Sequence, residues 1–200
     1  MIVLTDAEFL NNEAAYINAL FDNGLEVLHL RKPNASKEEM KQLLHEISDK
    51  YHYKIMIHSH YDLSTEFNLR GLHFTSSTKH LIDNYLETKG KKSQSIHEID
   101  ELKTINKHID YVFLSPLFPS ISKAGYTKPW NFMDLIVALK NQYSFEIIPL
   151  GGINTKNVVI AKEFGFKKIA VLGSIWEPVK AGGTIEEMLN IYELFKSDKY

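Results

Sequence analysis

Two glycine-bearing segments near the end of the sequence could bind a phosphate group. Gly151 and Gly152 follow one apolar run, and Gly173 and Ser174 follow the next. Glycine lets the backbone approach an anion closely, and the N–H groups at a helix start favour negative charge. Each segment alone is also explained as a tight turn without a ligand. As a pair on consecutive strands, the two segments favour a phosphate site.

Polar side chains at two other strand ends could complete such a site. His97 lies two residues after Ser95 on the same strand face, and a neutral imidazole can both donate and accept a proton. Arg31 ends another strand, with His29 on the same face, and a guanidinium can bind an anion through two hydrogen bonds. The alternatives are a helix-capping or packed histidine and a surface salt bridge.

The loop after the sixth apolar run carries two hydroxyl groups and a cation. Ser120, Ser122 and Lys123 suit a phosphate or another polar group of a substrate, and two prolines stiffen the segment before them. A solvated surface loop is the alternative interpretation.

The sequence His58-Ser59-His60 has the spacing of two metal ligands on one strand face. No second strand shows a clear matching set of histidine, aspartate and glutamate, so we predict no bound metal. His73 is interpreted as a packed strand residue. His58, Ser59 and Lys32 remain candidates for substrate contact.

These residues are positioned by short apolar runs that alternate with helical patterns. Several runs are almost entirely apolar, as is typical of parallel strands covered on both faces. The predicted strands are Ile2–Thr5, Glu26–Arg31, Lys54–His58, Gly71–Phe74, Ser93–Ile96, Tyr111–Leu114, Glu146–Leu150 and Lys168–Leu172. Eight strands alternating with helices predict one (β/α)₈ (TIM) barrel domain over residues 1–200. A doubly wound open sheet is the main alternative, although no G-x-G-x-x-G follows the first strand.

Capping signals mark the helix starts between these strands. Ser36 with Glu39 and Thr184 with Glu187 form the capping-box pattern. Asn154 or Thr155 can cap the helix after the seventh strand.

The composition excludes several classes of protein. A formal net charge of −2 gives no basic field for nucleic acid, and no apolar run reaches the length of a membrane span. The sequence has no cysteine, which excludes disulfides and thiolate nucleophiles and fits a cytoplasmic protein. Surfaces near Trp130 and Trp176 leave a homodimer open.

In their order along the chain, these segments resemble the thiamine phosphate synthase/TenI family from about Ile2 to Trp176. The supporting stretches are residues 27–31, 57–63, 71–74, 95–97, 115–119, 150–154 and 170–175. The resemblance implies a (β/α)₈ barrel of thiamine biosynthesis that binds a thiazole phosphate. It also implies one of two chemistries. The synthase joins a pyrimidine diphosphate to thiazole phosphate with Mg²⁺ held by aspartates after strands three and four, whereas TenI-like tautomerases shift a proton on a carboxythiazole phosphate without a metal.

The sequence departs from the synthase pattern at the metal positions. His58-Ser59 replaces Asn-Asp after strand three, and Ser77-Thr78 replaces an aspartate after strand four. Mg²⁺ prefers carboxylate oxygens, and hydroxyl groups are poor substitutes. The lysine that follows strand two in the synthase is absent or displaced to Lys32.

These departures favour the TenI-like branch. The expected protein is a metal-independent tautomerase that needs no cofactor and acts on a small phosphorylated thiazole. By resemblance, the segment Ser95-Ile96-His97 matches the tautomerase Ser-Val-His, whose histidine is the proposed acid and base. A divergent Mg²⁺-dependent thiamine phosphate synthase, a non-catalytic regulatory binder and an unrelated barrel isomerase stay open.

Overall fold

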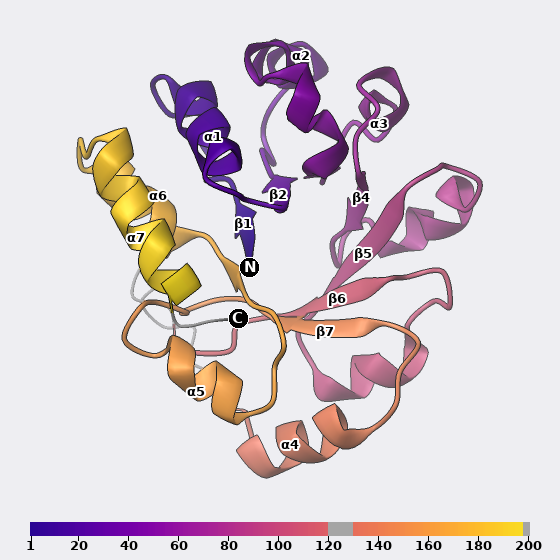
Figure 1. Ribbon diagram of the computed structural model, residues 1–200. Helices are drawn as coiled ribbons and strands as arrows, with labels where there is room; N and C mark the ends of the chain where they lie inside the picture. Colours follow the sequence, from indigo (N-terminus) through magenta and orange to yellow (C-terminus); the bar gives the residue numbers. More distant parts are fainter. Residues whose placement is uncertain (120–129, 198–200) are drawn as a thin grey trace.

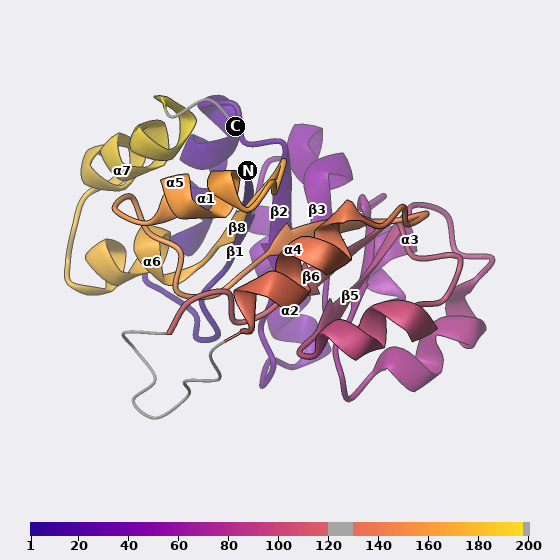
Figure 2. The same ribbon diagram turned by 90° about the horizontal axis from the view of Figure 1, so that it is seen from below.

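Eight parallel strands form one sheet that curves into a barrel, with the helices around its outside (Figure 1; Figure 2). The structure is a computed structural model of the 200-residue chain, and it describes residues 1–119 and 130–197. The strand order is β7-β6-β5-β4-β3-β2-β1-β8. A parallel bridge between Leu150 and Ala170 brings the end of β7 to β8 and nearly closes the barrel. The predicted (β/α)₈ barrel is therefore confirmed, and the open sheet is excluded.

The observed strands agree with the predicted ones to within about two residues at each end. They are β1 (Ile2–Leu4), β2 (Val27–Leu30), β3 (Ile55–Ile57), β4 (Gly71–Phe74), β5 (Lys91–Ile96), β6 (Tyr111–Leu114), β7 (Glu146–Pro149) and β8 (Ala170–Val171). Most differences are losses of one or two residues at either end of a strand, whereas β5 begins two residues earlier than predicted, at Lys91.

The helical elements between the strands are partly short 3₁₀ segments. The α-helices are α1 (Glu13–Asp22), α2 (Lys37–Glu46), α3 (Leu63–Glu66), α4 (Phe132–Lys140), α5 (Val158–Glu163), α6 (Gly173–Lys180) and α7 (Ile185–Ser197). The 3₁₀ segments are η1 (Asp49–Lys54), η2 (Lys79–Tyr85) and η3 (Ile99–Thr104). No helix in the described part of the chain is long and apolar enough to cross a membrane.

Side-chain capping fixes several helix starts as the sequence predicts. The Ser36 hydroxyl accepts the N–H of Glu39, and the Glu39 carboxylate accepts the N–H of Ser36. Thr184 and Glu187 form the same reciprocal pair before α7. Asn154 acts earlier than predicted, because its side chain accepts the N–H groups of Lys156 and Asn157 in the turn that precedes α5.

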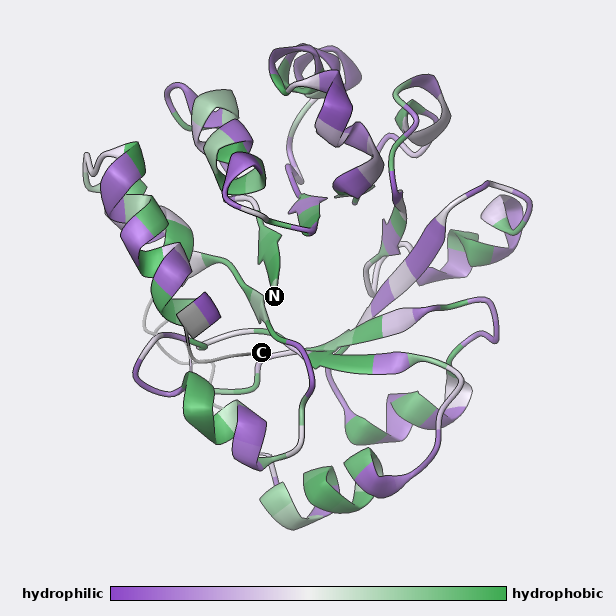
Figure 3. Ribbon diagram, in the orientation of Figure 1, coloured by the Kyte–Doolittle hydropathy of each residue, from purple (hydrophilic) through white to green (hydrophobic). Residues whose placement is uncertain are grey.

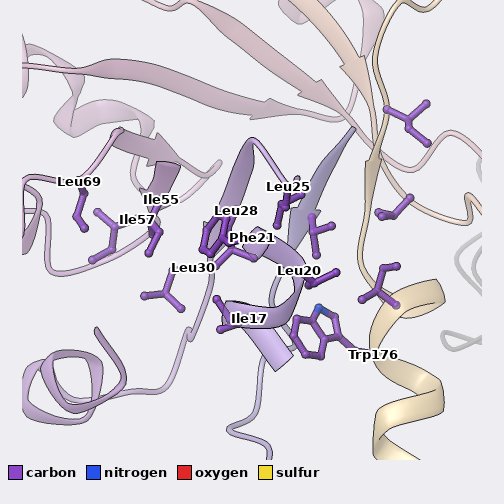
Figure 4. Packing of buried hydrophobic residues seen from close by; sticks show 14 of the residues in the cluster. Ile17, Leu20, Phe21, Leu25, Leu28, Leu30, Ile55, Ile57, Leu69 and Trp176 are labelled. Carbon is purple, nitrogen blue, oxygen red and sulfur yellow. The ribbon is translucent and has the colours of Figure 1, made fainter. Parts of the chain in front are cut away.

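The main core lies between the outer face of the sheet and the helices. Figure 4 shows Trp176 beside Ile17 and Leu20 of α1. Trp176 is fully buried and donates its indole N–H to the carbonyl of Leu4 over 2.6 Å. The Trp176 side chain itself therefore contributes nothing to an exposed pairing surface, because it joins α6 to β1 inside the fold.

The inner face of the barrel is apolar on one side and polar on the other. A second, smaller core cluster contains Ile2, Leu4, Met56, Tyr111, Phe113, Ile148 and Ala170. Buried polar side chains lie on β2, β4 and β5, among them His29, His73 and Ser93. In Figure 3, β1 is green and much of β5 is purple, which shows the same contrast along the backbone.

Candidate functional site

The carboxyl ends of all eight strands lie at one end of the barrel, because the strands are parallel. Active sites of this fold lie at that end and are built from the loops that follow the strands. The predicted site residues follow β2, β3, β5, β6, β7 and β8, or lie near the ends of these strands as His29 and Ser95 do, so the topology gathers them toward one mouth.

The turn after β7 depends on two glycines. Gly151 has a φ of +94° and Gly152 has a φ of +67°, a region that side chains rarely adopt. A Cβ atom on Gly152 would lie 2.5 Å from the carbonyl oxygen of Phe118. The Asn157 amide donates to the Gly152 carbonyl over 2.8 Å, which holds the turn from the other side. The glycines thus let the loop after β6 pack directly against this turn.

The turn after β8 lies against the turn after β7. The Ser174 hydroxyl donates to the carbonyl of Ile153 over 2.6 Å. Gly173 and Ser174 begin α6, so their N–H groups belong to the first helical turn and have no partner within the helix. In the described part of the chain, the N–H groups of Gly152, Gly173 and Ser174 form no hydrogen bond. Three backbone donors at adjoining turns can therefore bind a phosphate dianion.

His97 lies next to these turns, and its Nε2 has no hydrogen-bond partner among residues 1–119 and 130–197. Its Nδ1 lies 2.7 Å from the carbonyl oxygen of Ser115, so Nδ1 carries the hydrogen and donates it. The Ser115 hydroxyl in turn lies near Gly151. In its neutral form, His97 therefore presents Nε2 as a bare acceptor at the exposed surface of the mouth. This tautomer is the one that a general base requires.

A cluster of three histidines lies below the mouth, inside the barrel. His29 Nδ1 lies 2.9 Å from His58 Nε2, and His29 Nε2 lies 2.6 Å from the Tyr111 hydroxyl. The ring of His58 stacks on the ring of His73, with centroids 4.1 Å apart. His58 Nδ1 is buried and has no partner among the described residues. The sequence did not predict this cluster, because His29 and His58 were assigned to separate sites and His73 was interpreted as a packed strand residue.

Two serines of β5 bind the third histidine. His73 Nδ1 lies 2.8 Å from the Ser93 hydroxyl, and His73 Nε2 lies 2.8 Å from the Ser95 hydroxyl. The signal that could have revealed the cluster is period-two alternation, which places His29, His73 and Ser93 on the inward faces of their strands.

Burial keeps the whole cluster neutral. Burial, followed by the Arg31 guanidinium, lowers the pKa of His73 to about 3. Burial and the neighbouring ring of His73 lower the pKa values of His29 and His58 well below their usual range. Burial raises the pKa of the Tyr111 hydroxyl. All four groups are therefore uncharged at neutral pH, and each imidazole has one donor and one acceptor.

Arg31 and Lys32 are adjacent in sequence and point to different places. Arg31 is half-buried, and its charge acts on His58 and His73, which places it at the mouth. Lys32 is 1% exposed and forms an ion pair with Glu13 over 2.7 Å, and its ammonium also donates to the carbonyl of Glu8. The described geometry thus assigns Lys32 to a buried ion pair beside α1.

The structure contradicts the predicted pairing of His58 with His60, and it does not describe the predicted substrate residues of the loop after β6. His60 does not share a strand face with His58, because it has a φ of +50° and bonds the carbonyl of Ala35 through Nε2. Ser120, Ser122 and Lys123 lie outside the described residues, so the structure does not place them.

The residues after β3 and β4 do not fit Mg²⁺. They offer imidazole and hydroxyl groups from His58, Ser59 and Thr78, whereas Mg²⁺ requires hard oxygen ligands such as carboxylates. Asp62, the nearest carboxylate in the sequence after β3, forms an ion pair with Lys37 at the surface. Residues 120–129 contain no aspartate or glutamate.

A softer cation would have to displace existing hydrogen bonds. One ring nitrogen from each of His29, His58 and His73 lies within 4.8 Å of the other two, and this is the one such group of three in the described part of the chain. Nitrogen ligands of one zinc ion lie about 3.3 Å apart, as Zn–N bonds of about 2.0–2.1 Å require. Both ring nitrogens of His29 and of His73 already have partners. The cluster as observed is therefore a hydrogen-bonded network.

The fold and the mouth together define a (β/α)₈ barrel with backbone N–H donors grouped after β7 and β8. The family model described as thiamine monophosphate synthase (TMP-TENI) matches residues 1–175. The chain therefore belongs to this family of thiamine-biosynthesis enzymes.

Named relatives agree with the family assignment. The thiamine-phosphate synthase of Clostridium tetani is 27% identical over 179 residues, covering 84% of this chain and 83% of the relative. That of Dictyoglomus turgidum is 24% identical over 194 residues, covering 92% and 85%. These names belong to the synthase branch and not to TenI, so the family is confirmed and the predicted branch is not.

Solved structures show the same barrel. The crystal structure of thiamine phosphate pyrophosphorylase from Bacteroides thetaiotaomicron has 34% sequence identity and a TM-score of 0.80, and the match covers 98% of this chain and 95% of that chain. The 3-hexulose-6-phosphate synthase of Salmonella typhimurium matches with a TM-score of 0.66 at 16% identity, a likeness of fold alone.

Proposed function

We propose that this protein binds a thiazole phosphate and moves a proton on it without a divalent cation. The observation that supports this most directly is the donor set after β3 and β4, where imidazole and hydroxyl groups stand and carboxylates do not. Formation of thiamine phosphate expels diphosphate, whose several negative charges require a metal ion or an equivalent group of cations. A proton shift requires no such neutralisation.

In this proposal each described residue of the mouth has one task. The backbone N–H groups of Gly152, Gly173 and Ser174 bind the phosphate of the substrate. Arg31 binds its carboxylate. His97, whose Nδ1 is held by the Ser115 carbonyl, takes up and returns a proton through Nε2.

Thiamine phosphate synthesis is the second candidate, and the names of the relatives favour it. It would require the chain to neutralise diphosphate with Arg31 and the cation of the loop after β6, or with metal ligands other than carboxylates. The two candidates share the thiazole phosphate site and differ in the second substrate.

One pair of assays separates the two candidates. The purified protein is given carboxythiazole phosphate in the presence of EDTA, and separately pyrimidine diphosphate with thiazole phosphate and Mg²⁺. We expect turnover in the first assay and a loss of about 10²–10⁴-fold in kcat for His97→Ala. His108→Ala, at an exposed position away from the mouth, is the matched control. Efficient thiamine phosphate formation with no proton shift would overturn the proposal in favour of the synthase.

A further inference from the structure

The outward face of α4 exposes large apolar side chains to solvent. Met133 and Val137 lie one helical turn apart on this face and are 68% and 59% exposed. Leu135 and Ala138 on the inward face are buried in the core. Figure 1 places α4 at the outer rim of the barrel, and most of its length is green in Figure 3. Because a helix with apolar side chains on both faces is normally buried on both, the outward face has the composition of a covered surface.

The apolar surface continues from α4 to α5. The ring of Phe132, which is 45% exposed, stacks on the ring of Phe164 with centroids 4.9 Å apart. Phe164 directly follows α5, and Ile160, one turn earlier on that helix, is 38% exposed. Single exposed apolar residues are ordinary on a protein surface, whereas a contiguous group marks an interaction site.

Two charges of opposite sign flank Val137 symmetrically. Asp134 lies three residues before it and Lys140 three residues after it, and both residues are exposed. From the rise and twist of an α-helix, each charged residue lies about 4.5 Å from Val137 along the helix axis and about 60° from it around the helix, in opposite directions. Val137 is therefore the centre of this face, with an acid toward one end and a base toward the other.

Neither charge is neutralised by another described residue. Over residues 1–119 and 130–197, Asp134 and Lys140 form no ion pair. They cannot pair with each other along one helix, because side chains meet there at spacings of three and four residues and these two are six apart. Both charges are therefore available to a partner that covers the face.

We propose that the outward face of α4 is the centre of a two-fold homodimer interface, in which two α4 helices pack antiparallel across Val137. A second copy of this chain is the partner that the charges favour, because a two-fold interface must complement itself and a different protein requires no such symmetry. α4 begins two residues after Trp130, near which the sequence left a homodimer open. The proposal does not depend on the proposed function.

The antiparallel arrangement pairs every charge on this face. With the two-fold axis between the two Val137 side chains, Asp134 of one copy lies at the same height along the helix as Lys140 of the second copy. The flexible four-carbon stem of lysine spans the remaining gap. Met133 packs on the apolar part of that stem. Each contact occurs twice, because the same surface patch is used by both copies.

The mass of the protein in solution tests the interface. By sedimentation equilibrium at micromolar concentrations, we expect twice the chain mass of 23.0 kDa. Val137→Glu places two carboxylates against each other at the two-fold axis and should raise the dimer dissociation constant about 100-fold or more. Tyr53→Ser is the control, since Tyr53 is 56% exposed and lies on η1 before β3, whereas α4 lies between β6 and β7. A wild type with the mass of one chain would overturn the proposal and leave the face to a different protein.

Charge reversal tests the antiparallel pairing itself. Asp134→Lys brings like charges together twice in each dimer, so we expect the dimer dissociation constant to rise about tenfold. The double variant Asp134→Lys/Lys140→Asp restores two opposite-charge pairs and should return this constant to within about threefold of wild type. Both positions are exposed, so circular dichroism should show the same fold in all variants. A double variant that dimerises no better than the single one would overturn the pairing.

A disulfide locates the two-fold axis. The sequence has no cysteine, so Val137→Cys supplies the one thiol of each chain. Helices packed about 8–10 Å apart bring the two Cα atoms at this position to about 4–5 Å, a distance that suits a disulfide. With diamide as the oxidant, two thiols form one S–S bond, and we expect a covalent dimer on a non-reducing gel. Tyr53→Cys should stay monomeric in the same assay. Cross-linking of Val137→Cys no faster than that of Tyr53→Cys would overturn the proposal.

Discussion

The Ser174 hydroxyl donates a hydrogen bond to the carbonyl of Ile153 over 2.6 Å, and this bond joins the turn after β8 to the turn after β7. The two turns supply the free backbone N–H groups of the proposed phosphate site. This side chain, together with the bridge between Leu150 and Ala170, therefore holds the two halves of that site next to each other.

Loss of this bond should weaken phosphate binding. Ser174→Ala removes the hydroxyl and keeps the backbone N–H, so we expect the dissociation constant of thiazole phosphate to rise about tenfold, as the loss of one hydrogen bond predicts. Isothermal titration calorimetry gives the value. Ser144→Ala, at an exposed position before β7, should bind as wild type does. Equal affinity of Ser174→Ala and wild type would show that the turns hold their spacing without the hydroxyl.

A side chain at Gly152 should destabilise the fold. Gly152→Ala combines a φ of +67° with a Cβ only 2.5 Å from the Phe118 carbonyl oxygen, and strain of this kind costs about 1–3 kcal/mol before the contact is counted. Gly182→Ala is the matched control, since Gly182 has a φ of +91° and no atom within 4 Å of its added Cβ. We expect urea unfolding to show a larger loss for Gly152→Ala. Equal losses would mean that the loop after β6 moves aside freely.

Stability should fall when the pH is lowered below about 6.5. Burial lowers the pKa of His73 to about 3 in the folded protein, whereas the unfolded chain has the ordinary value of 6.5. Between these values the unfolded state binds the extra proton, so the free energy of unfolding decreases as the pH falls. At pH 5 the effect of His73 alone is roughly 2 kcal/mol, and His29 and His58 act in the same direction.

Urea unfolding at pH 7 and pH 5 measures this dependence. His73→Asn should reduce the difference between the two pH values, whereas His108→Asn, at an exposed position, should preserve it. A free energy of unfolding that is the same at both pH values would show that the histidines are not kept neutral by burial.

Removal of one partner of the buried ion pair should cost more than removal of both. Lys32 and Glu13 lie 2.7 Å apart with side chains 0% and 2% exposed, and burial lowers the pKa of Lys32 and raises that of Glu13. Lys32→Met leaves an unpaired buried carboxylate, which costs about 3–5 kcal/mol. The double variant Lys32→Met/Glu13→Gln should recover part of that loss. Losses that simply add would contradict a direct coupling between the two charges.

Local sequence signals determined the strands, the helix starts and the glycine turns. The capping pair Ser36 and Glu39 lies three residues apart, so its geometry depends on one helical turn alone. The apolar runs and the glycines that follow β7 and β8 are likewise properties of short segments. Because parallel strands bring these segments to one end of the barrel, the grouping of the two glycine turns of the proposed phosphate site was predictable from the order of the segments.

Contacts between distant strands were decided only by the tertiary structure. Period-two alternation gives the face on which His29 and His73 lie, but the register across β2, β3 and β4 and the curvature of the barrel determine that both approach His58. Lys32 follows Arg31 directly in sequence, yet it turns to Glu13 of α1 because the packing of that helix leaves a buried carboxylate to neutralise. These side-chain contacts join residues that are far apart in the chain, so no pattern within one segment predicts them.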